Sequence, residues 1–213
     1  MPTVTNAYNS GSGTETAPAG AVSCVITLDG GAGGGSKTNI AEFASEGGRG
    51  AGRCIKAVVS VAAGATVAYS VGAAGVGATV NGHGTAGGQS TVDTGTGGFS
   101  GLTLVANGGG NGAGSPGTAS GGDTNTTGSN PTLSPDFTTT NGNGGVGAGL
   151  GTGGNPGSRG GGGGGSVNNG ANGGTNGGNG GAGKIEFVYT TVDASIPNKI
   201  YMTNQAITRA SRW

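Results

Sequence analysis

The chain has 213 residues, of which 56 are glycine and 7 are proline, and its formal net charge at pH 7 is zero. A collagen triple helix is excluded, because it needs glycine at every third position and abundant proline, whereas the glycines of residues 141–154 keep no single phase of three. Only 8% of the residues are charged, so the self-repelling charge typical of disordered chains is absent and composition leaves an ordered structure open.

The predicted elements begin after a short arm. Residues 1–20 are small and polar and lead into "AVSCVITLDGG", where Val22, Cys24, Ile26 and Leu28 alternate with other residues as in a half-buried strand. Residues 38–46 are the one stretch that could be helical. The β-branched runs 53–61 and 66–71, joined by a turn that contains glycine, predict a β-hairpin.

Two further strands are predicted within 99–110 and 183–190, on either side of a glycine-rich middle. Only five of the 32 Val, Ile, Leu and Phe residues lie between positions 106 and 183, so a side-chain core cannot order that region. Polyglycine II offers an alternative, because its threefold extended helices point every N–H and C=O outward and can bond to parallel copies. We therefore expect residues 141–183 to be ordered by main-chain hydrogen bonds, anchored by strands or by neighbouring chains.

No motif predicts an enzyme, a cofactor or a metal site. "GNGGAGKI" has the glycine and lysine spacing of a phosphate loop, but Ile185 replaces the Ser or Thr that binds magnesium. The lone His83 is expected to be a solvated turn residue, and the scattered carboxylates form no catalytic pair. Cys24 and Cys54 are too few for a zinc site, and the sequence leaves open whether they are bridged.

Nucleic acid and membrane are not expected as partners. Three arginines in glycine context are too few for an RNA-binding tail of the arginine–glycine type, and a chain of zero net charge has little electrostatic attraction to phosphates. The sequence has no apolar run of membrane-spanning length and no secretion signal, so we expect synthesis in the cytoplasm without membrane insertion.

Two segments are candidate contact sites. Residues 123–141 interrupt the glycine-rich middle, and their stiffening prolines present Asp136, Phe137 and Thr138 as a candidate receptor-contact loop. The alternative is an ordinary surface loop, and threonine-rich arrays on a polyglycine bundle could instead bind ice. The C-terminal tail ends in Arg209, Arg212 and Trp213, residue types that are enriched at interfaces, so it is either a docking segment or a frayed end.

The order of motifs resembles the glycine-rich domain of tail fibre and adhesin proteins of tailed bacteriophages. "GTETAPAGAVSCVITLDGGAGGG" resembles the entry of that domain, "VSVAAGATVAYSVGAAGVG" its next pair of strands, and "GTAGGQSTVDTGTGGFSGLTLVANGGG" the strand and glycine burst that follow. "GGAGKIEFVYT" resembles the closing strand, so the resemblance spans about residues 13–190. It implies a β framework that carries polyglycine II helices, sometimes trimeric, displayed on a virion.

The sequence thus predicts a mostly β fold with little or no α-helix, built from an arm (1–20), a glycine-rich domain (21–190) and a tail (191–213). The expected function is that of a non-enzymatic, tail-associated virion protein that contacts a host surface glycan or protein and forms a homotrimer. The alternative is a structural fibre, decoration or tail-tip subunit that binds only other virion proteins.

Overall fold

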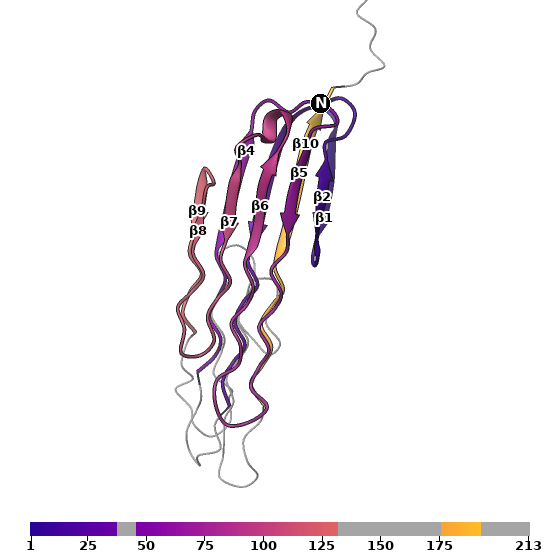
Figure 1. The fold of residues 1–213 in the computed structure, drawn as a ribbon. Helices are drawn as coiled ribbons and strands as arrows, with labels where there is room; N and C mark the ends of the chain where they lie inside the picture. The colour runs from indigo at the N-terminus through magenta and orange to yellow at the C-terminus, as the bar shows by residue number, and fades with distance from the viewer. Residues whose placement is uncertain (38–45, 132–175, 193–213) are drawn as a thin grey trace, which may run out of the picture.

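The computed structural model describes residues 1–37, 46–131 and 176–192, and within them ten strands form two antiparallel five-stranded sheets (Figure 1). The first sheet has the order β1 (Thr3–Tyr8), β10 (Lys184–Thr191), β3 (Ala21–Asp29), β4 (Arg53–Val58) and β9 (Thr124–Thr126). The second has the order β2 (Ser12–Thr16), β5 (Thr66–Ser70), β6 (Ser90–Gly95), β7 (Thr103–Ala106) and β8 (Ala119–Ser120).

The predicted mostly β fold is confirmed. A single 3₁₀ turn, η1 (Gly97–Phe99), is the one helical element among the described residues. The helix predicted over residues 38–46 lies outside them except for its last residue. None of the described residues belongs to a helix long and apolar enough to cross a membrane.

The two sheets pack through side chains from their facing surfaces. The core contains side chains with no exposed surface, namely Ile26, Phe187 and Tyr189 of the first sheet and Phe99 of η1. Leu104 of the second sheet is 1% exposed. Each such side chain contributes roughly 1.5–3 kcal/mol by leaving water. The sandwich, which we call the head, therefore has a compact apolar core of the ordinary kind.

The alternation predicted for residues 22–28 is confirmed at three of its four positions. Cys24, Ile26 and Leu28 are buried, but Val22 is 36% exposed. The register between β3 and β10 shifts here, because Thr190 pairs with Ser23 and Thr191 pairs with Ala21. Val22 is the extra residue of this bulge and is left outside the core.

The predicted hairpin of 53–61 and 66–71 is wrong. β4 pairs with β3 and β9 in the first sheet, whereas β5 pairs with β2 and β6 in the second. The connection 59–65 therefore crosses between the sheets. Val58 of β4 and Val67 of β5 both belong to the buried core between the sheets. The two strands can therefore bury their apolar faces without pairing with each other.

Residues 1–20, expected to be an arm, form β1 and β2, which are the edge strands of the two sheets. β1 pairs with β10 over Thr3–Tyr8 and β2 pairs with β5 over Ser12–Thr16. The turn between them passes from one sheet to the other at one side of the head. Their polar, threonine-rich composition suits edge strands, because little of either strand faces the core.

Every strand from β3 to β10 is continuous with a glycine-rich segment on the same side of the head (Figure 1). We call these segments together the bundle; they are residues 30–37, 46–52, 71–79, 82–89, 107–118, 127–131 and 176–183. The first and last described residues, Met1 and Val192, lie at the opposite end of the head (Figure 1). There Thr191 N–H donates to Pro2 O at 3.0 Å and Val192 N–H to Gly20 O at 2.9 Å.

Candidate functional site

The centre of the bundle is the segment 30–36, "GGAGGGS", which continues β3. Every residue of this central segment is buried, and Ala32 has no exposed surface. No large apolar side chain is present in it, so its burial cannot come from a core of the kind found in the head. The contacts that bury it are those of the main chain.

The central segment donates its N–H groups to three different neighbours in strict rotation. Gly30, Gly33 and Ser36 donate to the carbonyls of Gly52, Arg49 and Glu46; Gly31 and Gly34 donate to Gly88 and Thr85; Ala32 and Gly35 donate to Gly181 and Gly178. These donor–acceptor distances are 2.8–3.1 Å. A strand in a sheet would alternate between two neighbours, so this rotation by three shows a different backbone arrangement.

Two further neighbours donate to the central segment. Gly75 and Ala78 donate to Ala32 O and Gly35 O, and Gly109 donates to Gly31 O. The five flanking segments also bond to one another: 177–183 to 72–78, 82–88 to 72–78, 82–88 to 107–110, and 46–52 to 107–110. The central segment therefore has five neighbouring segments, and the hydrogen bonds link them in a series from 177–183 to 46–52.

The close approach of these backbones leaves no space for side chains. A Cβ added at Gly33 would lie 1.7 Å from Gly110 O, and one at Gly31 would lie 1.9 Å from Ala73 O. Similar positions occur throughout the flanking segments, for example at Gly77, where the distance to Gly177 O would be 1.9 Å. Glycine is required here for packing, not for turns, since Gly82 is the one described bundle glycine with a positive φ.

The transition from the head to the bundle is held by buried polar side chains. Arg53 forms a two-pronged ion pair with Asp29, with Nε–Oδ1 and Nη2–Oδ2 distances of 2.8 and 3.0 Å. Ser90 is fully buried; its Oγ donates to Asp29 O at 2.7 Å and accepts from Gly72 N–H at 2.9 Å. Together these residues connect β3, β4 and β6 at the level where the two sheets converge.

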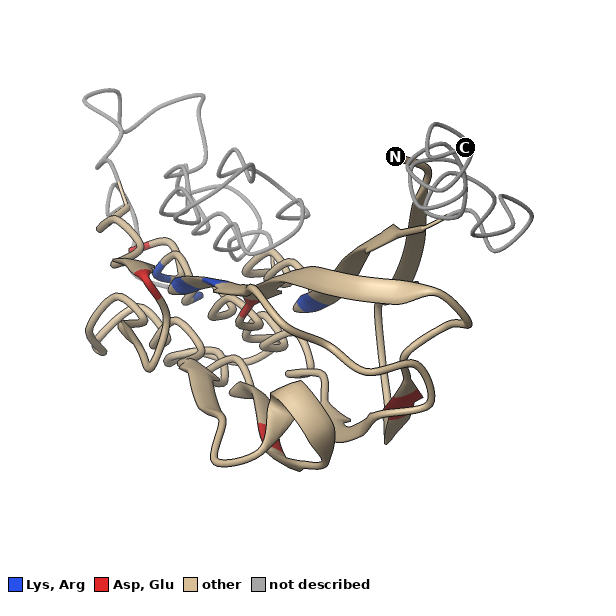
Figure 2. Cartoon of the chain, turned by 90° about the horizontal axis from the view of Figure 1, so that it is seen from above, with Lys and Arg blue, Asp and Glu red and all other residues tan. Residues whose placement is uncertain are grey.

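Polar side chains also close the far end of the bundle, which we call the tip. Lys37 Nζ donates to Thr79 O and to Asn176 Oδ1, at 3.0 and 2.9 Å. His83 is exposed, as expected, and its Nδ1 lies 2.9 Å from Ser36 Oγ. These side chains satisfy or cover main-chain groups where the extended segments end. The charged residues are few and scattered over the molecule (Figure 2).

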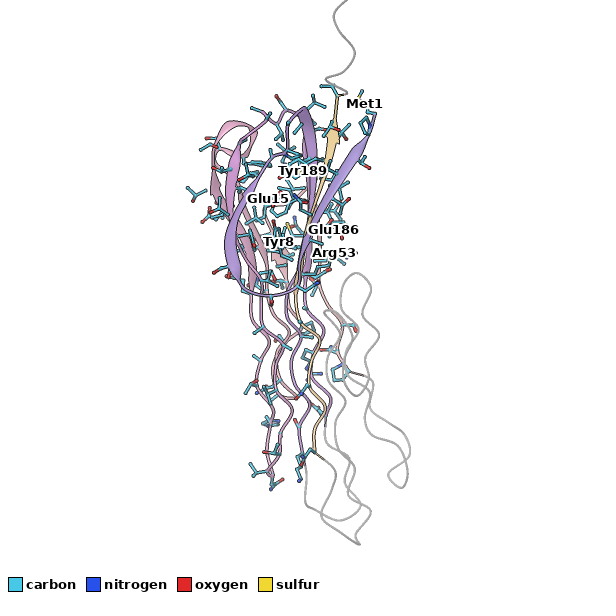
Figure 3. All side chains as sticks on the ribbon, turned by 90° about the vertical axis from the view of Figure 1, so that its right-hand side faces the viewer. Met1, Tyr8, Glu15, Arg53, Glu186 and Tyr189 are labelled. Carbon is cyan, nitrogen blue, oxygen red and sulfur yellow. The ribbon has the colours of Figure 1, made fainter. Side chains whose placement is uncertain are left out.

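A carboxylate inside the head ties the β1–β2 corner to the sandwich. Glu15 is 2% exposed and accepts hydrogen bonds from Asn6 Nδ2 at 2.7 Å and from the Tyr8 hydroxyl. Tyr8 stacks on Tyr69 with a centroid distance of 4.1 Å (Figure 3 shows Tyr8 and Glu15 in the head). The hydrogen bond to Glu15, followed by burial, raises the pKa of Tyr8 above its usual value.

Both cysteines are free and buried. Burial raises the pKa of the Cys24 thiol from 9.0 to about 12, and it raises the pKa of Cys54 as well. Neither thiol is therefore an activated nucleophile. Among the described residues, no group of three or more His, Cys, Asp or Glu side chains is placed to hold a metal ion.

The candidate contact residues from the sequence fall outside the described residues: Asp136, Phe137 and Thr138 between 131 and 176, and Arg209, Arg212 and Trp213 beyond 192. The described residues next to them lie on opposite sides of the head, since 131 and 176 belong to the bundle and Val192 lies beside Gly20. Comparison of the sequence with protein-family models and with curated proteins gives no match.

Sequence reasoning missed the Asp29–Arg53 pair and Ser90. A signal was present, because Asp29 is the last residue before one glycine run, Arg53 the first after another, and Ser90 follows a third. Polar residues at such boundaries are placed to satisfy main-chain groups as a strand changes into an extended glycine segment. Glu15 carried no comparable signal, because it lies in a short polar strand that composition did not identify.

Proposed function

We propose that this chain is a non-enzymatic virion protein of a tailed bacteriophage, associated with the tail. Its bundle would consist of polyglycine II helices and serve as a stiff body between a particle-attachment end and a host-contact end. The observation that carries this proposal is the rotation of hydrogen bonds by three around the central segment 30–36. Polyglycine II repeats every three residues, so successive N–H groups point to neighbours about 120° apart.

Stiffness follows from this bonding. In an ordinary linker the glycines would sample many conformations, whereas successive residues of the central segment are bonded to different neighbouring segments. Bending the bundle would therefore break bonds in several directions at once. A rigid body made mostly of small residues suits a protein that must hold a contact site at a distance from a particle.

The placement of the chain supports the assignment of the two ends. The segment containing Asp136–Thr138 is bounded by bundle residues 131 and 176, and the tail begins after Val192 at the opposite end of the head. In this proposal the 132–175 segment contacts a host glycan or protein. The tail, with Arg209, Arg212 and Trp213, attaches to another virion protein or to sister chains of a homotrimer.

Particles that carry variant chains would test the two ends separately. Phe137→Ala with Asp136→Ala is expected to reduce host adsorption without changing the amount of the chain per particle, whereas truncation after residue 192 is expected to prevent incorporation. Ser129→Ala, at an exposed position before the same segment, serves as a matched control. Normal adsorption by the double variant, together with failed incorporation of the truncated chain, would support the structural alternative in which only virion proteins are bound.

A further inference from the structure

The neighbours of the central segment occupy five of six regularly spaced positions. Successive bonds order them around the central segment as 177–183, 72–78, 82–88, 107–110 and 46–52. The three that accept its N–H groups, namely 177–183, 82–88 and 46–52, alternate with the two that donate to its carbonyls. A sixth neighbour between 46–52 and 177–183 would complete this alternation. Because both of those segments accept bonds from the central segment, the sixth neighbour would have to donate N–H groups to carbonyls of the central segment.

The central segment has two carbonyls that could accept bonds from such a donor. The carbonyls of 31, 32 and 35 accept bonds from the two donor neighbours, but within the described residues no N–H group donates to Gly30 O or Gly33 O. A Cβ added at Gly48 would lie 2.0 Å from Gly33 O, and one at Gly180 would lie 2.8 Å from it. Gly33 O is therefore located between the 46–52 and 177–183 segments, at the sixth position.

The segment 46–52 supplies the complementary groups. Arg49 and Gly52 donate to Gly110 O and Asn107 O, and Gly50 donates to Ser129 O. The remaining set of every third residue in this segment comprises Gly48 and Ala51, whose N–H groups donate to no carbonyl in the described part of the chain. Both residues are buried, Ala51 with 1% of its surface exposed. Buried N–H groups are nearly always paired in folded proteins, since leaving one unpaired costs about 1–3 kcal/mol.

We propose that the sixth position is a binding site for an extended glycine backbone, and that Gly160–Gly165 of the same chain occupies it. The occupant would donate to Gly30 O and Gly33 O and accept from Gly48 N–H and Ala51 N–H. Side chains at the positions that face these groups would prevent the close approach, so the occupant needs glycine there, and Gly160–Gly165 has glycine at every position. This inference rests on which residues of each segment bond to which neighbour, and it holds whether or not the protein belongs to a virion.

Length and connection select this occupant. Six consecutive glycines span roughly 19 Å at 3.1 Å per residue, close to the length of the seven-residue central segment. The chain leaves the described bundle after residue 131, next to 46–52 through the Gly50–Ser129 bond, and returns at 176 in the segment that bonds to the central one. The sixth position thus lies between the points of departure and return, and the intervening residues are numerous enough to reach it.

Residue-resolved amide exchange in the full-length protein tests the proposal. Replacing all six residues, Gly160→Ser through Gly165→Ser, is expected to speed exchange at Gly48 and Ala51 by about tenfold, the upper end of the net contribution of one hydrogen bond. Replacing Gly142, Gly144, Gly145, Gly147, Gly149 and Gly151 by Ser is the matched control and is expected to leave both amides unchanged. The Gly52 amide, which donates to Asn107 O, reports whether the bundle itself stays folded.

Unchanged protection of Gly48 and Ala51 in the serine variant would overturn the proposal, as would rapid exchange of both amides in the unmodified protein. Protection that is lost on dilution would assign the position to a second copy instead. If the variant also loses Gly52 protection, the unmodified protein decides: nuclear Overhauser contacts between the Ala51 amide and protons of Gly160–Gly165 are expected, and their absence contradicts the assignment.

Discussion

The head and the bundle are built from the same passes of the chain but are ordered by opposite means. In the head, two sheets stay apart because Phe99, Phe187 and other side chains fill the space between them. In the bundle, the continuations of the same strands meet directly and bond through N–H and C=O groups in three directions. The head should therefore be destabilised by the loss of side-chain atoms, and the bundle by their addition.

Removing a large side chain from the head is expected to have the greatest effect on stability. Phe187 is fully buried and contacts Tyr8, Tyr69 and Tyr189 edge-on or stacked. Phe187→Ala should lower the free energy of unfolding by about 3–5 kcal/mol, through lost burial and the cavity left behind. Denaturant titration measures this; a loss under about 1 kcal/mol would show that the head core is not the main source of stability.

Adding one methyl group to the bundle is expected to cost nearly as much. Gly33→Ala places a Cβ 1.7 Å from Gly110 O, so backbones must separate, at a cost of about 3 kcal/mol, the upper part of the usual range for overpacking. The control is Gly64→Ala in the head, where φ is +75° but nothing lies within 4 Å, and which should cost about 1–2 kcal/mol from left-handed strain alone. Equal losses in the two variants would argue against backbone packing in the bundle.

The junction between the two regions can be weakened separately. Asp29→Asn removes the charge that Arg53 pairs with, and because both side chains are largely buried the loss is expected to be about 2 kcal/mol. Lys56→Ala, which breaks the more exposed pair with Asp123, should cost less than about 1 kcal/mol. Thermal unfolding of both variants checks this order, and a smaller effect for Asp29→Asn would show that the junction pair is dispensable.

An effect confined to alkaline pH is expected from the buried thiol of Cys24. Its folded pKa of about 12 lies above the ordinary 9.0, so the folded state favours the neutral thiol. The corresponding stability is fully present below pH 9 and is lost as the pH rises towards 12. Cys24→Ala should therefore lose less stability between pH 8 and 11 than the unmodified chain, while Cys54, Tyr8 and Tyr189 titrate in both. Parallel pH dependences would contradict the assignment.

The sequence predicted five of the ten described strands, namely β3, β4, β5, β7 and β10, but it did not predict how they divide between the two sheets. The alternation of Cys24, Ile26 and Leu28 identified β3, because a half-buried strand requires it. The same pattern in 53–61 and 66–71 could not distinguish a hairpin from strands facing each other across a core. Both arrangements bury alternate residues, and the distinction depends on partners such as β2, which come from a polar segment with little pattern of its own.

The sequence predicted main-chain hydrogen bonding in the glycine-rich middle, residues 141–183, of which only 176–183 are described. The structure shows such bonding for 176–183 and also around residues 30–36, a segment that the sequence analysis did not single out. A run of glycines has no pattern of apolar and polar side chains that depends on which neighbour each residue faces. The central segment therefore could not be identified from sequence periodicity. The contact residues Asp136–Thr138 and Arg209, Arg212 and Trp213 stay predictions.

Scalar couplings across hydrogen bonds test the central claim most directly. In isotope-labelled full-length protein, the amide nitrogens of Gly33, Gly34 and Gly35 are expected to couple to the carbonyl carbons of Arg49, Thr85 and Gly178, three successive residues bonded to three different segments. Couplings that alternate between two neighbours would indicate an ordinary sheet. No couplings, together with rapid amide exchange, would show that the central segment is not ordered by its main chain.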